Sequence, residues 1–177
     1  LYTLNRSTYV NLRWIAFLGQ IISILIVEFI FEYKFNYIPC LGIITLGAIT
    51  NILLQFQVKA NQISNSLSLS YLTYDILQLS FLFYLTGGIT NPFIFLLIIP
   101  AVFSSQYLTI ASSVILVLIT ISSISFLTFN YIELPHPGEL HFHVPDYYLY
   151  AIPISILIGL LFVYMGTSKI QQFKRQG

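Results

Sequence analysis

The seven residues Gly87–Phe93 have types and spacing that suit a ligand-binding turn between two helices. Gly87 and Gly88 can adopt positive φ angles, which end a helix without a side-chain clash. Asn91 is a good helix N-cap, and Pro92 fits the first helical position, where its missing N–H loses nothing. The spacing therefore predicts a tight helix–turn–helix hairpin.

The same hairpin would offer binding groups to a flat, apolar molecule. A helix that begins at Pro92 presents unpaired N–H groups and the positive end of its dipole. A quinone fits this place, because its oxygens could accept from backbone N–H groups or from the Asn91 amide while its ring packs on Phe93. Two interpretations stay open, a purely structural turn and a quinone site. The candidate quinone-binding residues are Gly87, Gly88, Ile89, Thr90, Asn91, Pro92 and Phe93.

Polar side chains inside apolar segments form a second group of candidate residues. Asp75 lies well inside the third apolar segment, where a carboxylate costs about 2.5–3.5 kcal/mol on membrane-insertion scales. Gln78 shares the helix face of Asp75 at i+3, and Gln20 and Asn51 are expected at a similar depth. One interpretation is a polar network that holds helices together. The other is a proton or signal relay below a bound quinone.

A third group lies in the predicted outer loop, which contains His136, His141 and His143. His141 and His143 could place two imidazoles on one side of an extended segment, an arrangement that can bind metal. A solvated polar loop is the simpler interpretation, so no metal site is predicted. The single cysteine, Cys40, excludes a disulfide framework and is expected to be a small buried residue.

The elements that must position these residues are membrane helices. Of the 177 residues only 7% are charged, against about 25% in a typical soluble domain, and 57% are hydrophobic. The net charge of +1 is too small for an electrostatic nucleic-acid binder, so no direct nucleic-acid contact is expected. At about 20 residues per span, this length accommodates six membrane helices.

Hydrophobic runs separated by Pro, Gly, Asn and charged residues define the predicted spans. The expected fold class is all-α, a polytopic membrane protein with six transmembrane helices. The expected spans are about 14–31, 38–56, 67–86, 92–103, 110–131 and 147–166. We expect residues 1–13 to form a cytoplasmic N-terminal segment, residues 14–167 the six-helix domain, and residues 168–177 the start of a cytoplasmic linker.

Positive charge near the ends of spans predicts the orientation. If the N-terminus is cytoplasmic, only Lys34 among the basic residues lies on the outer side. The basic residues expected on the cytoplasmic side are Arg6, Arg13, Lys59, Lys169, Lys174 and Arg175. Both termini are therefore predicted to be cytoplasmic, and the Gly87–Phe93 hairpin is predicted to lie on the outer side.

Residues 87–93 read GGITNPF and resemble the GGxxNPF heptapeptide of RegB/PrrB-type redox-sensing histidine kinases. Residues 12–20 (LRWIAFLGQ) resemble the first span of that family, and residues 75–79 and 84–86 resemble its third span. The resemblance covers the six-span region, with weaker likeness in the second span and in the loop 133–146. It implies that ubiquinone binds at the heptapeptide and that the redox state of the quinone pool controls kinase activity.

The resemblance also implies the rest of a two-component system. The histidine box and the ATP-binding glycine boxes are missing here, so no catalytic domain is identified in this chain. The parent protein is expected to be an ATP-dependent sensor histidine kinase whose phosphotransfer takes place in a cytoplasmic kinase region beyond Gly177. The implied partners are membrane lipid, the quinone pool, a second copy in a homodimer and a cognate response regulator, and the implied location is the bacterial inner membrane. Two alternatives remain, a small transporter or channel lined by Asp75, Gln20 and Asn51, and a quinone-binding subunit of a respiratory complex.

Overall fold

The computed structural model describes residues 4–30, 36–133 and 152–160, and helices make up most of this part of the chain. Residues 152–160 contribute a further helical segment. The elements in chain order are β1 Leu4–Asn5, α1 Arg6–Leu25, the π-helix η1 Ile26–Ile30, α2 Ile38–Gln57, β2 Gln62–Ile63, α3 Asn65–Leu85, the 3₁₀ helices η2 Gly88–Thr90 and η3 Pro92–Ile98, α4 Ile99–Tyr107 and α5 Ile110–Phe129.

The all-α class is confirmed, and three of the described helices are long and apolar enough to cross a bilayer. They are Arg6–Ile30, Ile38–Gln57 and Ile110–Phe129. These helices indicate a multi-pass membrane protein, whereas six crossings stay a prediction. The sixth expected span, 147–166, is described only at residues 152–160, and the remainder lies outside the described residues.

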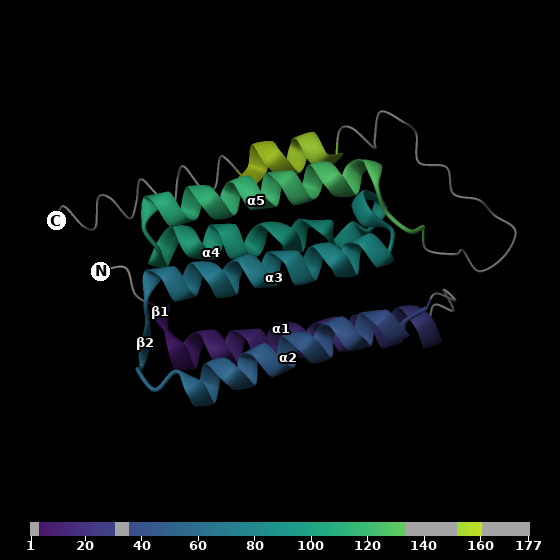
Figure 1. The fold of residues 1–177 in the computed structure, drawn as a ribbon. Coiled ribbons are helices and arrows are strands. Elements are labelled where there is room, and N and C mark those ends of the chain that lie inside the picture. The colour runs from purple at the N-terminus through teal and green to yellow at the C-terminus, as the bar shows by residue number, and fades with distance from the viewer. Residues whose placement is uncertain (1–3, 31–35, 134–151, 161–177) are drawn as a thin grey trace, which may run out of the picture.

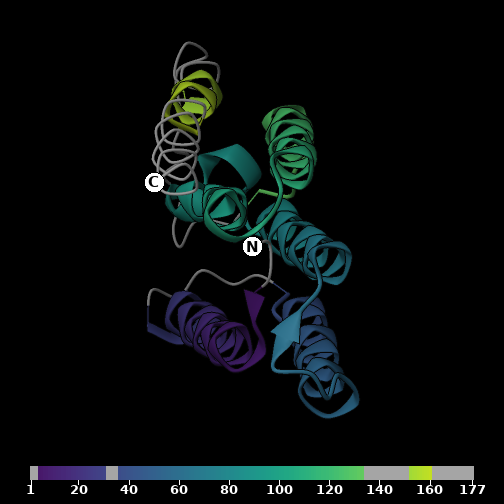
Figure 2. The same ribbon diagram turned by 90° about the vertical axis from the view of Figure 1, so that its left-hand side faces the viewer.

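The helices form two groups (Figures 1 and 2). α1 and α2 lie side by side, and α3, α4 and α5 pack together above them, with the helical segment at residues 152–160 beyond. α3 lies between the groups, since it packs against α2 on one side and against α4 and α5 on the other. This central position explains how α3 accommodates polar residues that would be costly next to lipid.

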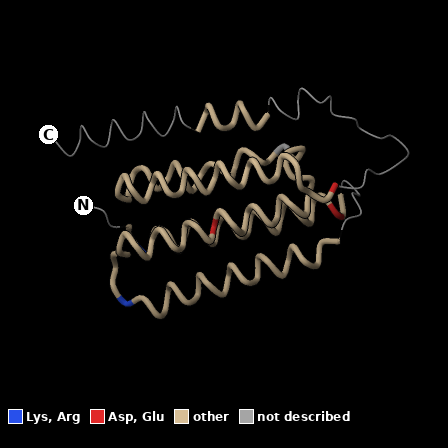
Figure 3. Tube along the Cα trace, turned by 45° about the horizontal axis from the view of Figure 1, so that its top comes forward, with Lys and Arg blue, Asp and Glu red and all other residues tan. Residues whose placement is uncertain are grey.

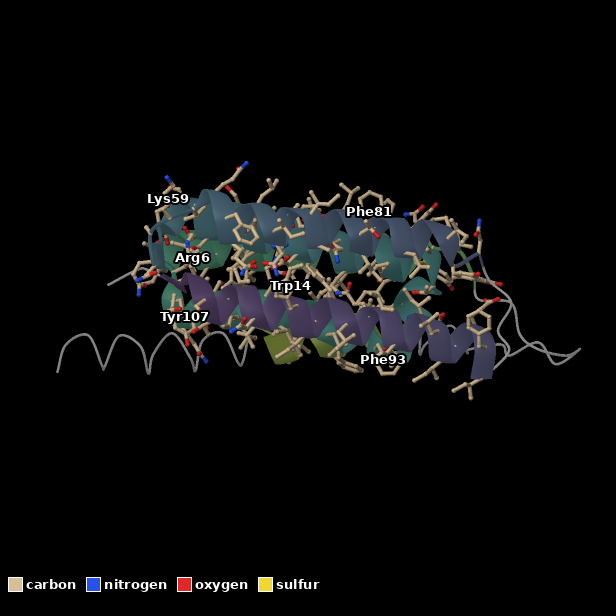
Figure 4. All side chains as sticks on the ribbon, turned by 90° about the horizontal axis from the view of Figure 1, so that it is seen from below. Arg6, Trp14, Lys59, Phe81, Phe93 and Tyr107 are labelled. Carbon is tan, nitrogen blue, oxygen red and sulfur yellow. The ribbon has the colours of Figure 1, made fainter. Side chains whose placement is uncertain are left out.

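The first helix begins at Arg6, about two turns before the predicted start at Trp14. Asn5 is the N-cap, and its side chain accepts a hydrogen bond from the backbone N–H of Thr8. Arg13 therefore lies inside α1, where it is buried, rather than at the flank of a span. The orientation prediction then rests on the other basic residues, of which Arg6 and Lys59 lie near one end of the bundle (Figure 4).

The fourth helical segment combines η3 and α4 and ends at Tyr107, later than the predicted residue 103. Its first seven residues form a 3₁₀ helix, which rises about 2.0 Å per residue instead of 1.5 Å. The segment is therefore about 27 Å long, close to the thickness of a bilayer core.

A two-stranded antiparallel sheet joins the start of α1 to the linker between α2 and α3. β1 pairs with β2 in the register Leu4 with Ile63, and both side chains are fully buried in the main core. The backbone N–H of Arg6 donates to the carbonyl of Asn61 at 2.8 Å. These bonds hold the first turn of α1 against the linker. The predicted spans did not include this contact.

Small polar residues line the contact between α3, α4 and α5. Asn65 donates to the Ser112 hydroxyl at 2.8 Å, and the Ser113 hydroxyl donates to the Ser104 carbonyl at 3.1 Å. Small side chains let membrane helices approach closely, and their hydroxyls bond across the contact. These bonds join α3 to α5 and α5 to α4.

Candidate functional site

The backbone of the hairpin has the conformation expected from its sequence. α3 ends at Leu85, and Gly87 and Gly88 have φ angles of 96° and 54°, in the left-handed region that favours glycine. Asn91 is the N-cap of η3 and Pro92 is its first residue. The predicted helix–turn–helix hairpin is confirmed, although a 3₁₀ turn, η2, occupies the connection.

The Asn91 side chain is fully engaged in holding the turn. Its Oδ1 accepts from the backbone N–H of Phe93 at 2.9 Å. Its Nδ2 donates to the carbonyl of Thr86 at 3.0 Å and to the Thr86 hydroxyl at 3.1 Å. Asn91 therefore closes the hairpin on itself, and its amide is not free to donate to a quinone oxygen as the sequence suggested.

The hairpin is clamped to the chain that leaves α5. The N–H of Ile132 donates to the carbonyl of Tyr84 at 2.8 Å, and the N–H of Gly87 donates to the carbonyl of Ile132 at 2.9 Å. A Cβ on Gly88 would lie 2.6 Å from Cγ of Tyr131, so only glycine fits there. Burial, reinforced by the Glu133 carboxylate, raises the pKa of Tyr131.

One side of the hairpin stays open. Ile89 and Ile94 are buried in the core, at 1% exposure each, whereas the Phe93 ring is 55% exposed. Phe95 and Leu96, two and three residues later, are also exposed, at 53% and 45%. In Figure 4 Phe93 lies away from the end that carries Arg6 and Lys59. The heptapeptide thus presents one aromatic ring outward, while its other described groups build the turn.

The second candidate group gathers around a buried ion pair between α1 and α3, in a bundle whose described trace carries few charges (Figure 3). Nε and Nη2 of Arg13 donate to Oδ1 of Asp75 at 3.0 and 2.9 Å, and the Tyr9 hydroxyl donates to Oδ2 of the same carboxylate. Arg13 also donates to the Thr50 hydroxyl at 2.9 Å and to Oδ1 of Asn51 at 3.3 Å. Three helices therefore meet at one guanidinium.

Aromatic rings complete the surroundings of the Arg13 guanidinium. Four ring centroids lie 5.2–5.9 Å from its Cζ atom, within the range of cation–π attraction. They belong to Tyr9, Phe17, Tyr71 and Tyr74. Only 3% of the Arg13 side chain is exposed. Aromatic rings and hydrogen-bond partners therefore surround the guanidinium in place of water.

The glutamines form a separate pair farther along α1 and α3. Nε2 of Gln78 donates to Oε1 of Gln20 at 3.0 Å. The Gln78 amide lies against Gly47 of α2, where a Cβ would come within 2.9 Å of its Cδ. The four predicted polar residues thus divide into two sets: Asp75 and Asn51 meet through Arg13, and Gln78 meets Gln20.

Sequence reasoning missed Tyr9, Arg13 and Thr50 as members of the cluster. A signal was present, because Asn5 is a strong N-cap and a helix that starts there places Tyr9 and Arg13 on one face at i and i+4. Cys40 is buried, as expected. The loop histidines His136, His141 and His143 lie outside the described residues, and the described ranges contain no group of three metal-ligating side chains.

Comparison with known proteins adds one match. The sensor histidine kinase RegB of Cereibacter sphaeroides is 29% identical to this chain over 164 residues, which is 92% of the chain and 36% of RegB. This chain is a homologue of RegB. The match is to the N-terminal part of RegB, so the chain spans about a third of the length of this relative. No family model matches the chain, and no solved structure matches it.

The homology agrees with the resemblance that the heptapeptide indicated. Because the aligned residues cover nearly the whole chain, the α1–α5 bundle is homologous to part of RegB. Three long apolar helices and this relative together indicate a multi-pass protein of a bacterial membrane. The homology connects the chain to sensor histidine kinases of two-component systems.

Proposed function

We propose that this chain is the membrane input region of a sensor histidine kinase and that it binds a quinone, ubiquinone by family resemblance, at the Gly87–Phe93 hairpin. Homology to a sensor histidine kinase supports the first part. The open apolar face of the hairpin supports the second. ATP-dependent phosphotransfer, a homodimer and a cognate response regulator belong to the same proposal and would involve the kinase region of the parent protein.

The observation that carries quinone binding is the exposure of the Phe93 ring on a rigid turn. Positive φ angles, the Asn91 bonds and the Tyr131 contact hold the turn, and they leave Phe93 55% exposed. A fixed aromatic ring next to apolar side chains favours stacking of a flat ring with little loss of side-chain entropy. Stacking on Phe93, rather than donation by the Asn91 amide, is therefore the expected binding interaction.

Sensing would follow from differential affinity. If oxidised and reduced quinone bind two arrangements of the bundle with different affinity, the ratio of the two forms shifts the population of those arrangements. α3 and the chain after α5 both attach to the hairpin, so they are the elements through which a shift there would spread.

The polar cluster favours a structural or signalling role over transport. Asp75, Asn51, Gln20 and Gln78 bond to other side chains across helix contacts rather than lining an open path. A proton or signal relay through Asp75 is part of this proposal. It is supported by the position of Asp75 on α3, the helix that ends at the hairpin. If Asp75→Asn left both folding and the redox response intact, the relay would be excluded.

Photolabelling with an azido-quinone tests the binding site directly. In liposomes, we expect label on peptides that contain residues 87–96, with protection by excess unlabelled ubiquinone. Label confined to α1 or α2, or label that excess ubiquinone does not reduce, would contradict the proposal. Reading the coding sequence past Gly177 separates a kinase from a respiratory subunit, since only a kinase continues into a histidine box.

A further inference from the structure

The contact between the α1–α2 pair and α3 is a continuous seam with a charged centre. On α3, Asp75, Gln78 and Leu82 follow one another at i, i+3 and i+7 and therefore lie on one face. That face meets α1 and α2, since Asp75 binds Arg13, Gln78 binds Gln20, and Leu82 packs with Cys40 in one core cluster. The ion pair and the buried thiol thus belong to the same contact.

The bonds of Arg13 are divided unequally across this seam. On its own side, Arg13 bonds to Thr50 and Asn51 of α2, and the Asn51 amide donates in turn to the Val10 carbonyl of α1 at 3.1 Å. On the other side, its hydrogen bonds end on the single carboxylate of Asp75. If α1 and α2 move together, Arg13 keeps its α2 partners and gives up Asp75 together with the Tyr71 and Tyr74 rings of α3.

The opposite side of α3 is held differently. Asn65 bonds to the Ser112 hydroxyl and, through its Oδ1, accepts from the backbone N–H of Thr109 at 2.9 Å. These are neutral bonds between small groups, supported by close packing of α3 against α5. The contact of α3 with α1 and α2 thus has a charged centre, whereas its hydrogen bonds toward α5 are neutral.

We infer that the Arg13–Asp75–Tyr9 cluster is a releasable latch between the α1–α2 pair and helices α3–α5. A buried ion pair can often be replaced by apolar side chains without loss of stability, so its best-attested use is to specify one arrangement over another. Release of the latch lets the α1–α2 pair tilt away from α3, and closure restores the seam. Coupling of the latch to the hairpin, through α3, rests on the proposed quinone site.

Cys40 provides a native reporter of the seam. It is the only cysteine of the chain, and 0% of the residue is exposed. It belongs to a core cluster that includes Leu82 of α3 and Phe17 and Ile24 of α1. Its rate of alkylation by N-ethylmaleimide in liposomes therefore measures how often the seam opens. We expect Asp75→Asn to accelerate alkylation about tenfold, and Tyr9→Phe, which keeps the ion pair, to accelerate it about threefold.

Asn65→Leu is the matched control. It removes the two Asn65 hydrogen bonds, to Ser112 and from Thr109, on the α5 side of α3. It should therefore leave the alkylation rate within about twofold of the parent rate. Circular dichroism establishes that each variant keeps its helix content. If Asp75→Asn does not fold, the alkylation rate of Tyr9→Phe, compared with that of Asn65→Leu, decides whether the latch exists. Equal rates in the latch variants and Asn65→Leu would overturn the latch.

The double variant Arg13→Met/Asp75→Leu tests the link to the hairpin. In the parent chain, saturating ubiquinone should change the alkylation rate at least threefold. In the double variant, ubiquinone should still bind but leave the rate unchanged. A ligand-dependent rate in the double variant, or none in a parent chain that binds ubiquinone, would overturn the coupling. If the parent chain binds no ubiquinone in a separate binding assay, the proposed function fails, and the latch is judged by Asp75→Asn against Asn65→Leu.

Discussion

The polar cluster at Arg13 and the hairpin at Gly87–Phe93 are built by opposite means. The cluster depends on side chains: a guanidinium, a carboxylate and a phenol satisfy one another between helices that are distant in sequence. The hairpin depends on backbone: two glycines with positive φ, a capping Asn91 and a paired Ile132 define its shape. Buried polar groups in the cluster have partners, whereas the hairpin leaves an aromatic ring exposed.

This difference separates the residues that build the turn from the residue that is proposed to bind a ligand. In the heptapeptide, Gly87, Gly88 and Asn91 are explained by the turn alone. Phe93 is not, since its ring is half exposed and the turn does not need it. Mutation of Gly87, Gly88 or Asn91 should therefore affect both folding and ligand binding. Mutation of Phe93 should affect ligand binding alone.

The largest expected effect is on the cluster. Arg13→Met leaves the buried carboxylate of Asp75 without its charge partner, which should cost about 3–5 kcal/mol of unfolding free energy. Arg13→Met/Asp75→Leu removes both charges and should recover most of this loss. Thermal or denaturant unfolding in detergent micelles measures both variants. If the double variant were as unstable as Arg13→Met, the Arg13–Asp75 ion pair would stabilise the protein by more than the mutual compensation of its two charges.

Gly88→Ala should break the hairpin at somewhat lower cost. The new Cβ would meet the root of the Tyr131 side chain, and alanine is strained at a φ of 54°, so we expect a loss of about 2–4 kcal/mol. Gly42→Ala is the control, because it lies in α2 with no atom within 4 Å of the added carbon. The same unfolding assay applies. Equal stability of the two variants would refute the close packing of Tyr131 on the turn.

Gly47→Ala should have a smaller effect, because it displaces only the end of a flexible side chain. The Gln78 amide must move, which breaks its bond to Gln20 and costs about 0.5–2 kcal/mol. Gly19→Ala, which meets no atom within 4 Å, should be neutral or slightly stabilising. If Gly47→Ala matched Gly19→Ala in unfolding, the seam between α2 and α3 would be looser than described.

Sequence alone predicted the hairpin well and the cluster poorly, for a physical reason. The turn is local, so residue preferences at Gly87, Gly88, Asn91 and Pro92 sufficed to predict positive φ angles and the N-cap. The cluster joins residues more than 60 positions apart, and hydropathy placed Arg13 outside the first span. A hydropathy scale counts the burial of the Arg13 charge as unfavourable. Inside the bundle, Asp75 and four aromatic rings compensate this charge.

The most direct test of quinone binding compares two neighbouring phenylalanines of nearly equal exposure, 55% for Phe93 and 53% for Phe95. Equilibrium titration with a short-chain ubiquinone in liposomes would measure the affinity of the parent chain, Phe93→Ala and Phe95→Ala. We predict that Phe93→Ala weakens binding about tenfold, as expected for loss of one aromatic stacking contact, while unfolding stability is unchanged and Phe95→Ala binds nearly as the parent does. Equal affinity of Phe93→Ala and the parent chain would contradict quinone binding at this hairpin.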